Sequence, residues 1–233
     1  MPLASAFFDR PTLDVLRDLI GKVLVHDTAE GRTSGTIVEA EAYIGEDDPA
    51  CHAAPGLTLR NAPLYGEPGR AYVYLNYGLH HMVNVVTQTA GEPAAILIRA
   101  LAPIDGVEIM RRRRHVARQR TKSGAVVDEA ELCRGPGNLT VALGITLAQN
   151  RQSLTRGRLV IEDRHIAPDE LVWSPRIGIR VGTEHLWRCA WLNHASVSVD
   201  RGRGRMSSDR RRTATARGAA AGLAAPRGSR PVR

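Results

Sequence analysis

The sequence predicts a single mixed α+β domain with a curved, largely antiparallel sheet, a protruding β-hairpin and flanking helices. Two observations predict this class. Strand-like runs come in adjacent pairs joined by polar or glycine-containing turns, which is typical of antiparallel hairpins. Helical segments do not alternate regularly with the strands, as they do in parallel βαβ sheets. With 43% apolar and 24% charged residues, the 233-residue chain fits a globular domain over residues 1–200 followed by a tail over 201–233.

The N-terminal third of the chain predicts a helix, a hairpin and a long loop. Residues 11–21 are expected to be helical, because Pro11 suits a first helical turn and large apolar residues recur after it at helical spacing. Residues 22–27 and 35–44 are strand-like and flank a polar turn, which indicates a hairpin. Residues 45–69 are rich in Gly, Pro and polar residues and predict a long irregular loop, of the kind that is usually functional.

A second hairpin and a buried strand follow. Residues 70–77 and 79–87 are expected to pair through a turn near Gly78, and the apolar run 94–101 predicts a buried strand. Asp105 is the expected N-cap of the next helix. The remaining predicted elements are helices over 106–120 and 128–145, the second interrupted by Gly-Pro-Gly at 135–137, and strands over 157–162, 176–181 and 187–199.

Positive charge is concentrated at the C-terminal end. The net charge is +8, and residues 201–233 hold ten arginines against one aspartate, so residues 1–200 carry a net charge of about −1. The tail has few large apolar side chains, and we expect it to be disordered, either as a solvated extension or as a non-specific nucleic-acid arm. A second basic cluster starts at Arg111–Arg114, where phosphate contact and a solvated helix face both remain open.

Several functional classes find no support in the sequence. No apolar run approaches the roughly 20 residues that span a bilayer, and the first ten residues do not resemble a secretory signal. Three widely spaced cysteines predict no disulfide framework, and we expect a cytoplasmic protein. The histidines and cysteines lack zinc-site spacing, and nucleotide-binding and serine-hydrolase motifs are missing. We therefore expect neither a metal nor a cofactor.

Charged residues inside apolar runs are the first candidates for chemistry. Glu39 and Glu41 are two residues apart on a predicted strand, so both point the same way, about 6.6 Å apart along the chain. Their apolar surroundings favour a raised carboxyl pKa and acid–base work, although two ordinary carboxylates at a solvent-facing edge would show the same spacing. Arg99 ends an otherwise buried strand and needs a partner, either as a structural ion pair or by meeting Glu41 around a water.

Aromatic side chains are unusually placed. All five tyrosines lie between residues 43 and 77. Tyr72 and Tyr74 share one face of a predicted strand, where they either pack the sheet or stack on a planar base in a pocket. Tyr77 falls at the tip of the predicted hairpin, where it has little to pack against. An exposed ring at a hairpin tip suits insertion between stacked bases.

These residues belong to a set of segments that occur in a characteristic order. The set is Ile37–Gly45 (IVEAEAYIG), His52, Arg60-Asn61, Pro68-Gly69, Tyr72-Val73-Tyr74, Tyr77-Gly78, Asn84, Leu97–Ala100 (LIRA) and Leu132–Gly137 (LCRGPG). In order and spacing it resembles the alkyladenine (3-methyladenine) DNA glycosylases, the single-domain type that also exists in mammals. The resemblance spans about residues 5–199 and leaves the 201–233 tail outside the family pattern.

The resemblance implies a monofunctional glycosylase of base excision repair, expected to be a monomer acting on double-stranded DNA that contains an alkylated purine. Such an enzyme flips the damaged nucleotide into a pocket and hydrolyses the N-glycosidic bond with water. By motif match, Glu41 is the general base that activates the water, and Arg99 and the backbone carbonyl of Ile177 position it. The only lysines, Lys22 and Lys122, lie away from these motifs, so we expect no Schiff-base step.

The resemblance also implies how the flipped base is held. Tyr43, His52 and Tyr74 would line the pocket and stack on the base. Asn84 would lie at the pocket floor and disfavour the exocyclic amino group of normal guanine. Electron-rich rings attract the positive charge of 3-methyladenine and 7-methylguanine by cation–π interaction, worth about 0.5–2 kcal/mol. Neutral lesions such as hypoxanthine or ethenoadenine gain less from these rings.

Contacts with the DNA follow from the same motifs. Tyr77 would intercalate and fill the vacated space, and Arg60 and Asn61 lie in a loop that approaches the DNA backbone. Two segments depart from the family pattern. Asn138 stands where the family usually has Lys, which removes one phosphate contact, and residues 193–198 (NHASVS) replace the common Asn-Pro-aromatic-Val-Ser pattern.

Two other functions remain open on the sequence. The first is a non-catalytic nucleic-acid-binding module on the same scaffold, for which the basic tail and Tyr77 would suffice. A filled pocket would support it, whereas a buried Glu41–Arg99 pair facing an open pocket would argue against it. The second is a glycosidase acting on free sugars with Glu39 and Glu41 as its pair. Same-face neighbours match poorly to carboxylates that must flank a bond from two sides.

Overall fold

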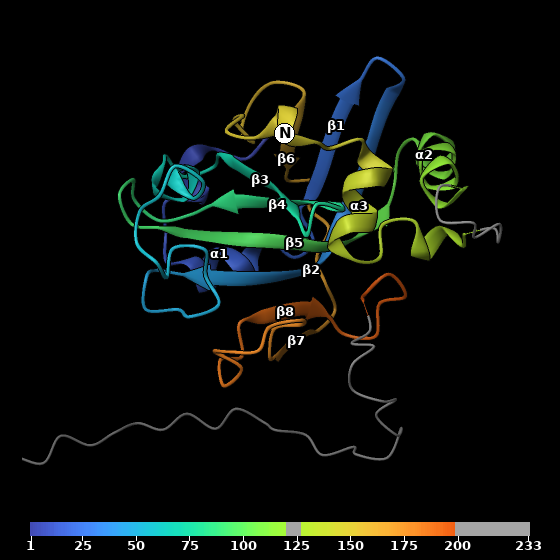
Figure 1. The fold of residues 1–233 in the computed structure, drawn as a ribbon. Helices are drawn as coiled ribbons and strands as arrows, with labels where there is room; N and C mark the ends of the chain where they lie inside the picture. The colour runs from blue at the N-terminus through green and yellow to red at the C-terminus, as the bar shows by residue number, and fades with distance from the viewer. Residues whose placement is uncertain (120–126, 199–233) are drawn as a thin grey trace, which may run out of the picture. The chain divides into compact units, whose positions relative to one another are not determined.

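A computed structural model describes residues 1–119 and 127–198 (Figure 1), and the predictions for 120–126 and for the tail lie outside the described residues. The strands form one curled sheet in the order β3-β4-β5-β2-β1-β6, and β8, itself paired with β7, pairs with Glu39–Glu41 in the C-terminal half of β2. All named strand pairs are antiparallel. The predicted α+β class with a largely antiparallel sheet is therefore confirmed.

Helices and strands of the described residues do not alternate regularly along the chain. The strands are β1 (Val23–Thr28), β2 (Gly31–Ile44), β3 (Ala71–Asn76), β4 (His80–Val86), β5 (Ala94–Pro103), β6 (Leu159–Glu162), β7 (Leu171–Ser174) and β8 (Arg188–Trp191). The α-helices are α1 (Thr12–Leu19), α2 (Val107–Gln119) and α3 (Pro136–Leu143). Short 3-10 helices cover Ser5–Phe7, Ala62–Tyr65, Glu129–Glu131 and Leu147–Gln149. Both predicted hairpins, β1–β2 and β3–β4, are present.

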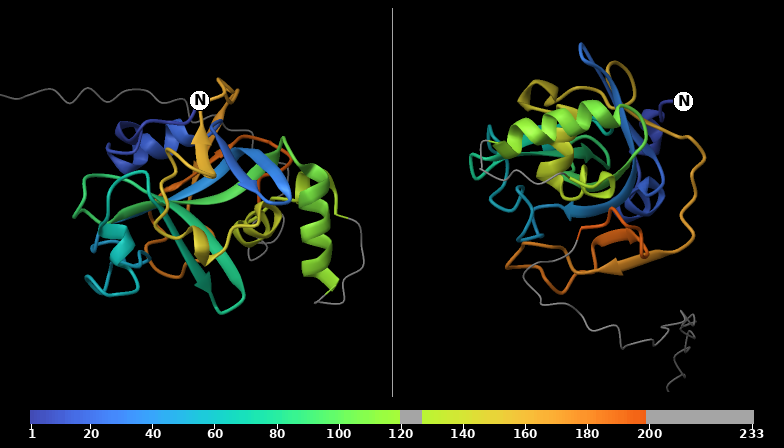
Figure 2. Two further views of the ribbon diagram at one scale, coloured as in Figure 1. Left: turned by 90° about the horizontal axis from the view of Figure 1, so that it is seen from above. Right: turned by 90° about the vertical axis from the view of Figure 1, so that its right-hand side faces the viewer.

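The helices cover the two faces of the sheet. The helix α1 starts after Pro11 and buries Val15, Leu16 and Leu19 on one face of the sheet, while α3 packs on the opposite face against β4 and β5 (Figures 1 and 2). Because each helix has an apolar side toward the sheet, burial of these side chains is the main force holding the layers together. The largest cluster of buried apolar side chains includes the fully buried Phe8 and Met110.

The sheet is irregular where β2 and β5 meet at Glu39. The pairing runs Ile37↔Leu101, Glu39↔Ala100 and Ala40↔Ile98, so Val38 and Arg99 have no direct partner across this ladder. Bulges of this kind bend a strand and redirect its side chains, and they are common next to active sites. Here the irregularity brings the side chains of Glu39, Glu41 and Arg99 together.

Three predicted elements differ from the structure. The predicted 128–145 helix is divided, because Gly135 has a φ of +95° and Pro136 starts the separate helix α3. The predicted strand 176–181 is wrong: these residues form an irregular turn, and the strand in this region is β7, which ends before Pro175. The predicted strand 187–199 is reduced to β8, after which the chain turns at residues 192–193.

The basic run on α2 is largely engaged within the protein. Arg111 pairs with Glu108 and Glu129, and Arg113 pairs with Glu30. Arg114 is 8% exposed and bonds the side-chain oxygen of Asn138, whose amide group donates to the backbone carbonyl of Arg134. Among the four consecutive arginines, Arg112 is the exposed one. The structure thus favours a packing role for most of the Arg111–Arg114 run.

The described residues show neither a membrane-spanning helix nor a cluster of metal-ligating side chains. No helix among them is both long and apolar enough to cross a membrane. No group of three or more potential metal-ligating side chains is found in the described ranges. Cys51, Cys133 and Cys189 are all free and buried.

Candidate active site

A cavity of about 410 Å³ opens on the face of the sheet formed by β2 to β5. Its volume is within the range of about 300–1,000 Å³ that is usual for small-molecule sites. The strands contribute one wall, the 45–69 loop a second and the 176–179 turn a third. Its lining includes Tyr43, Ala50, Cys51, His52, Leu64, Tyr72, Tyr74, Asn76, Tyr77, Met82, Asn84, Ala95, Leu97, Arg99, Pro136 and Ile177–Ile179. Most of the predicted site residues are therefore brought together.

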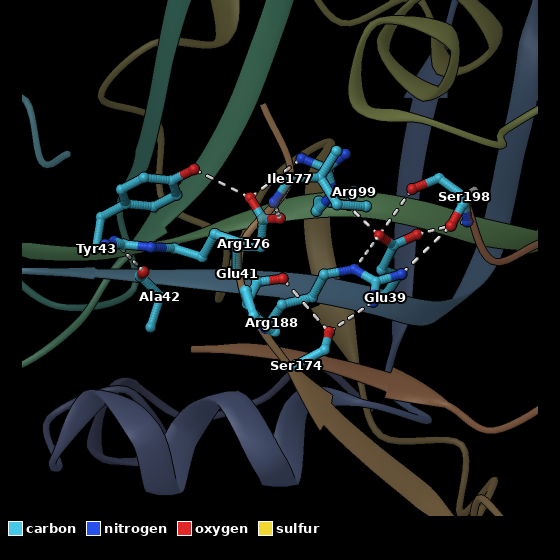
Figure 3. A network of polar contacts seen from close by, with 11 residues as sticks. Glu39, Glu41, Ala42, Tyr43, Arg99, Ser174, Arg176, Ile177, Arg188 and Ser198 are labelled. Atoms are coloured by element: carbon cyan, nitrogen blue, oxygen red, sulfur yellow. Dashed lines mark hydrogen bonds and ion pairs between the residues drawn. The ribbon is translucent and has the colours of Figure 1, made fainter. Parts of the chain in front are cut away.

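Glu41 lies directly behind this lining, with no exposed surface. Its Oε1 accepts the backbone N–H of Ile177 at 2.7 Å, and its Oε2 accepts the Tyr43 hydroxyl at 3.0 Å and Arg99 Nη1 at 3.1 Å (Figure 3). Each of the three donors belongs to a residue that lines the cavity. The carboxylate is thus one contact away from whatever occupies the cavity, and Oε1 keeps an unused acceptor position.

The pKa values of the neighbouring Glu39 and Glu41 carboxyls are shifted in opposite directions. Burial raises the pKa of the Glu41 carboxyl above its ordinary value, and this effect exceeds the lowering by Arg99, the Ile177 amide and the Tyr43 hydroxyl. Burial acts in the same direction on Glu39, but the Arg99 and Arg188 guanidiniums and the Ser198 hydroxyl hold the pKa of Glu39 below its ordinary value. Glu41 is therefore the stronger base of the two.

Glu39 is the centre of a buried polar network rather than half of an acid–base pair. It accepts Arg99 Nε at 3.0 Å, Arg188 Nε at 2.7 Å, and the backbone N–H and hydroxyl of Ser198 at 2.6 and 2.7 Å (Figure 3). Arg188 also donates to Ser174 at 2.8 Å. With four donors on its carboxylate, Glu39 holds Arg99 in place for Glu41, and this occupation argues against a glycosidase that uses both carboxylates.

Aromatic rings form the far wall of the cavity. The ring centroids of Tyr72 and Tyr74 lie 5.3 Å apart, and those of His52 and Tyr74 lie 4.5 Å apart. His52 Nδ1 and the Tyr72 hydroxyl are hydrogen-bonded at 2.8 Å. Burial, with a smaller contribution from Arg60, lowers the pKa of His52, so the ring is neutral at neutral pH. Tyr72 is 2% exposed, as a ring that packs the sheet would be, and it also lines the cavity, as a ring that stacks on a base would.

The innermost lining comes from β4 and β5. Asn84 is 4% exposed and donates from Nδ2 to the backbone carbonyl of Tyr72 at 2.9 Å. Met82 and Leu97 add apolar surface beside it. Because one amide hydrogen of Asn84 is committed to the backbone, the orientation of its side chain in the cavity is fixed.

Two exposed features flank the cavity. Tyr77, at the tip of the β3–β4 hairpin, is 92% exposed and has a φ of +48°. Arg60 is also exposed, in the 45–69 loop. Asn61 is different, because it is 2% exposed and its amide bonds His52 O, Gly56 O and Thr58 N. Asn61 therefore shapes the loop that carries His52 and Arg60.

Several functional contacts were not predicted from the sequence. Arg188 and Ser198 bond Glu39, Arg176 lies against the Tyr43 ring, and Asp48 bonds Arg176. Each is a single polar residue in irregular backbone or a short strand. The only sequence signal for Arg176 and Arg188 is their position among apolar residues, the same signal that pointed to Arg99. For Ile177, the contact seen is its amide with Glu41, and its carbonyl stays a prediction.

Comparison with known proteins agrees with this arrangement. Residues 6–195 match the family described as methylpurine-DNA glycosylase. Two relatives named for 3-methyladenine DNA glycosylase are each 47% identical to this chain. The one from Chlorobium phaeobacteroides aligns over 188 residues, 80% of this chain and 89% of its own length, and the one from Methanocella arvoryzae over 200 residues, 84% and 95%. The chain therefore belongs to the methylpurine-DNA glycosylase family of DNA-repair hydrolases.

Proposed function

We propose that this protein removes alkylated purines, such as 3-methyladenine and 7-methylguanine, from duplex DNA as a monomeric, monofunctional glycosylase. The observation that carries the proposal is the buried Glu41 carboxylate, held by three donors that all line an aromatic cavity. The cavity is large enough for a purine, and its rings suit stacking. An open cavity next to the Glu41 carboxylate, which can act as a base, favours an enzyme over a non-catalytic binding module.

The damaged nucleotide leaves the DNA helix and enters the protein on the face that carries the β3–β4 hairpin. The hairpin and the 45–69 loop extend on the same side of the sheet (Figure 2). Tyr77 at the hairpin tip is exposed and sits at the cavity mouth, as a wedge between stacked bases requires. Arg60, on the neighbouring loop, supplies positive charge toward the phosphates.

The rings of Tyr43, His52 and Tyr74 hold the flipped base. Purines alkylated at N3 or N7 carry positive charge, and cation–π attraction to such rings is worth about 0.5–2 kcal/mol. Because His52 is neutral, it does not repel this charge. Asn84, fixed by its bond to Tyr72, faces the base and disfavours the exocyclic amino group of normal guanine.

Hydrolysis uses Glu41 as the base. A water donates a proton to Glu41 while its oxygen forms a bond to C1′ of the deoxyribose, and the electrons of the C1′–N bond pass to the purine. The cationic base leaves as a neutral molecule, so it needs no acid. Arg99 and the Ile177 carbonyl position the water, and the Glu41 charge stabilises the oxocarbenium-like transition state. Since Glu41 has no exposed surface, this water enters beside Ile177 as the substrate binds.

The direct test is incubation with duplex DNA methylated by an alkylating agent, followed by identification of the free bases. The wild-type protein is expected to release 3-methyladenine and 7-methylguanine, and Glu41→Gln is expected to release neither while retaining affinity for damaged duplex. Glu30→Gln is a matched control, because Glu30 is an exposed carboxylate paired with Arg113. Wild-type excision rates in the Glu41→Gln protein would refute the assignment of the base. Binding of damaged duplex by the wild type without any base release would support the non-catalytic module instead.

A further inference from the structure

A second buried ion pair, between Arg176 and Asp48, lies behind two of the three donors to Glu41. Ile177, whose amide reaches Glu41 Oε1, follows Arg176 directly in the chain. Tyr43, whose hydroxyl reaches Oε2, has its ring under the Arg176 guanidinium, with the guanidinium carbon 4.7 Å from the ring centroid. The third donor, Arg99, is held separately by Glu39. Arg176 is therefore the common neighbour of the Ile177 and Tyr43 donors.

Arg176 is itself held by four contacts. Both of its terminal nitrogens bond the Asp48 carboxylate, with Nη2 at 2.8 Å from Oδ1. Nη1 also donates to the backbone carbonyl of Ala42 at 3.0 Å, and Nη2 to that of Gly182 at 3.3 Å. Neither side chain of the pair has exposed surface. A bidentate, charge-assisted pair of this kind fixes geometry as well as charge.

Two aromatic rings lie against the guanidinium. Besides Tyr43, the ring of Trp187 lies with its centroid 5.0 Å from the guanidinium carbon. His185 stacks on Trp187, with centroids 4.0 Å apart and planes 9° apart. The backbone carbonyl of Trp187 accepts the N–H of Ala42 at 2.8 Å. The Tyr43 ring thus contacts the Arg176 guanidinium and also lines the cavity.

The turn after Ile177 closes tightly on the ion pair. Gly182 has a φ of +63°, and a Cβ at this position would lie 2.9 Å from Arg176 Nη2 and 3.4 Å from Asp48 Oδ1. A side chain at residue 182 would therefore push against the ion pair and adopt a strained backbone conformation. The close approach leaves Arg176 little room for another rotamer.

We propose that Arg176, anchored by Asp48, is a positioning residue of the glycosylase: it fixes the Ile177 amide and the Tyr43 hydroxyl on the two oxygens of Glu41. This inference rests on the proposed function, because it gives Glu41 the role of base. Arg176 acts through its neighbours and does not line the cavity. Loss of its geometry lowers the rate of the chemical step and leaves affinity for damaged DNA in place.

The pH dependence distinguishes positioning from a loss of stability. The ionisable groups that face Glu41 are Glu39 and Tyr43 on β2, Tyr74 on β3, Arg99 on β5, and Arg176 on the turn. The Ile177 amide lowers the pKa of Glu41 and so favours the ionised form. When this bond is lost, the pKa rises further, and the base becomes protonated at a higher pH. The acid limb of the excision rate then moves upward.

The experiment compares Arg176→Gln and Arg176→Lys with the wild type by single-turnover excision from methylated duplex between pH 5 and 9. Arg32→Gln is the matched control, because it breaks an exposed bidentate pair with Asp27 outside the cavity. We expect Arg176→Gln to slow excision on the order of tenfold to a hundredfold, as for a lost hydrogen bond to a charged group. Its acid limb should move up by about half a pH unit or more, with affinity nearly unchanged. Arg176→Lys keeps the charge and should recover part of the rate.

Outcomes that overturn the inference are distinct from those that overturn the proposed function. If the wild type releases no base, the function itself fails. If the wild type is active and folded Arg176→Gln matches it in rate and acid limb, the positioning role fails. A lower rate with an unchanged acid limb also refutes it, because that result shows that the bond between the Ile177 amide and Glu41 is intact. If Arg176→Gln does not fold, Arg176→Lys is compared with the wild type instead. In that variant the Ile177 amide must exchange hydrogen faster than in the wild type, or the positioning role fails.

Discussion

Replacing Glu39 with Gln tests the central network of the site. The Glu39 carboxylate, which has no exposed surface, accepts one bond from Arg99, one from Arg188 and two from Ser198. Gln removes the negative charge and places an NH2 group where one oxygen accepted hydrogen bonds, so donor meets donor and two arginines lose their shared partner. Breaking a buried ion pair costs about 3–5 kcal/mol.

The expected loss is large enough for ordinary unfolding measurements. For a domain of this size, about 1 kcal/mol changes Tm by about 2–4 °C, so Glu39→Gln should lower Tm by roughly 6–20 °C. Glu30→Gln, which breaks an exposed pair, should reduce stability by less than about 1 kcal/mol. A destabilisation by Glu39→Gln no larger than that of the control, measured by denaturant unfolding, would refute the view that this network supports the fold.

The pH dependence of stability gives an independent check on the same residue. Because the folded-state pKa of Glu39 lies below its unfolded value, the ionised carboxylate stabilises the fold above the unfolded pKa of about 4.3. This stabilisation is lost as the pH falls through the lower, folded pKa. The wild type should therefore lose stability toward acid more steeply than Glu39→Gln does. Parallel stability curves for the two proteins below about pH 5 would contradict the assignment.

Three further predictions concern the cavity and the hairpin. The wild-type excision rate should fall as the pH is lowered through the Glu41 pKa, which lies above the ordinary glutamate value, and an acid limb at or below that value would contradict the burial argument. Tyr77→Ser should slow single-turnover excision or weaken binding to damaged duplex by about tenfold, whereas Leu79→Ser at the same tip should have the smaller effect; equal effects would count against a specific wedge. Tyr74→Leu should lower the excision of 7-methylguanine more than that of hypoxanthine by about twofold to thirtyfold, and an unchanged ratio would exclude a cation–π contribution from this ring.

Much of the site was predictable because its residues follow local patterns. Alternation along a strand put Glu39 with Glu41 and Tyr72 with Tyr74. In the structure both glutamates bond Arg99, and both tyrosines line the cavity. A charge inside an apolar run marked Arg99, since such a charge requires a partner. The hairpin followed from two strand-like runs around Gly78. These are short-range rules, and the structure follows them here.

The remaining contacts depend on distant parts of the chain. Asp48 and Arg176 meet across 128 residues, and Glu39 and Ser198 across 159. Periodicity carries no information about such pairs, because at least one partner of each pair lies in irregular backbone. The same limit explains the incorrect strand at 176–181: its alternating apolar residues resemble a strand, but Gly178 and Gly182 at positive φ and the Arg176 contacts fold it into a turn.

The Ser198 contact has a consequence for where the protein can be shortened. The family match ends at residue 195, yet Ser198 supplies two of the four bonds to Glu39 through its backbone and hydroxyl. A truncation drawn at the edge of the matched region would remove both bonds and uncover a charged group in the middle of the protein. Expression boundaries, purification tags and fusions should therefore be placed after this serine, which belongs to the catalytic domain as much as any strand does.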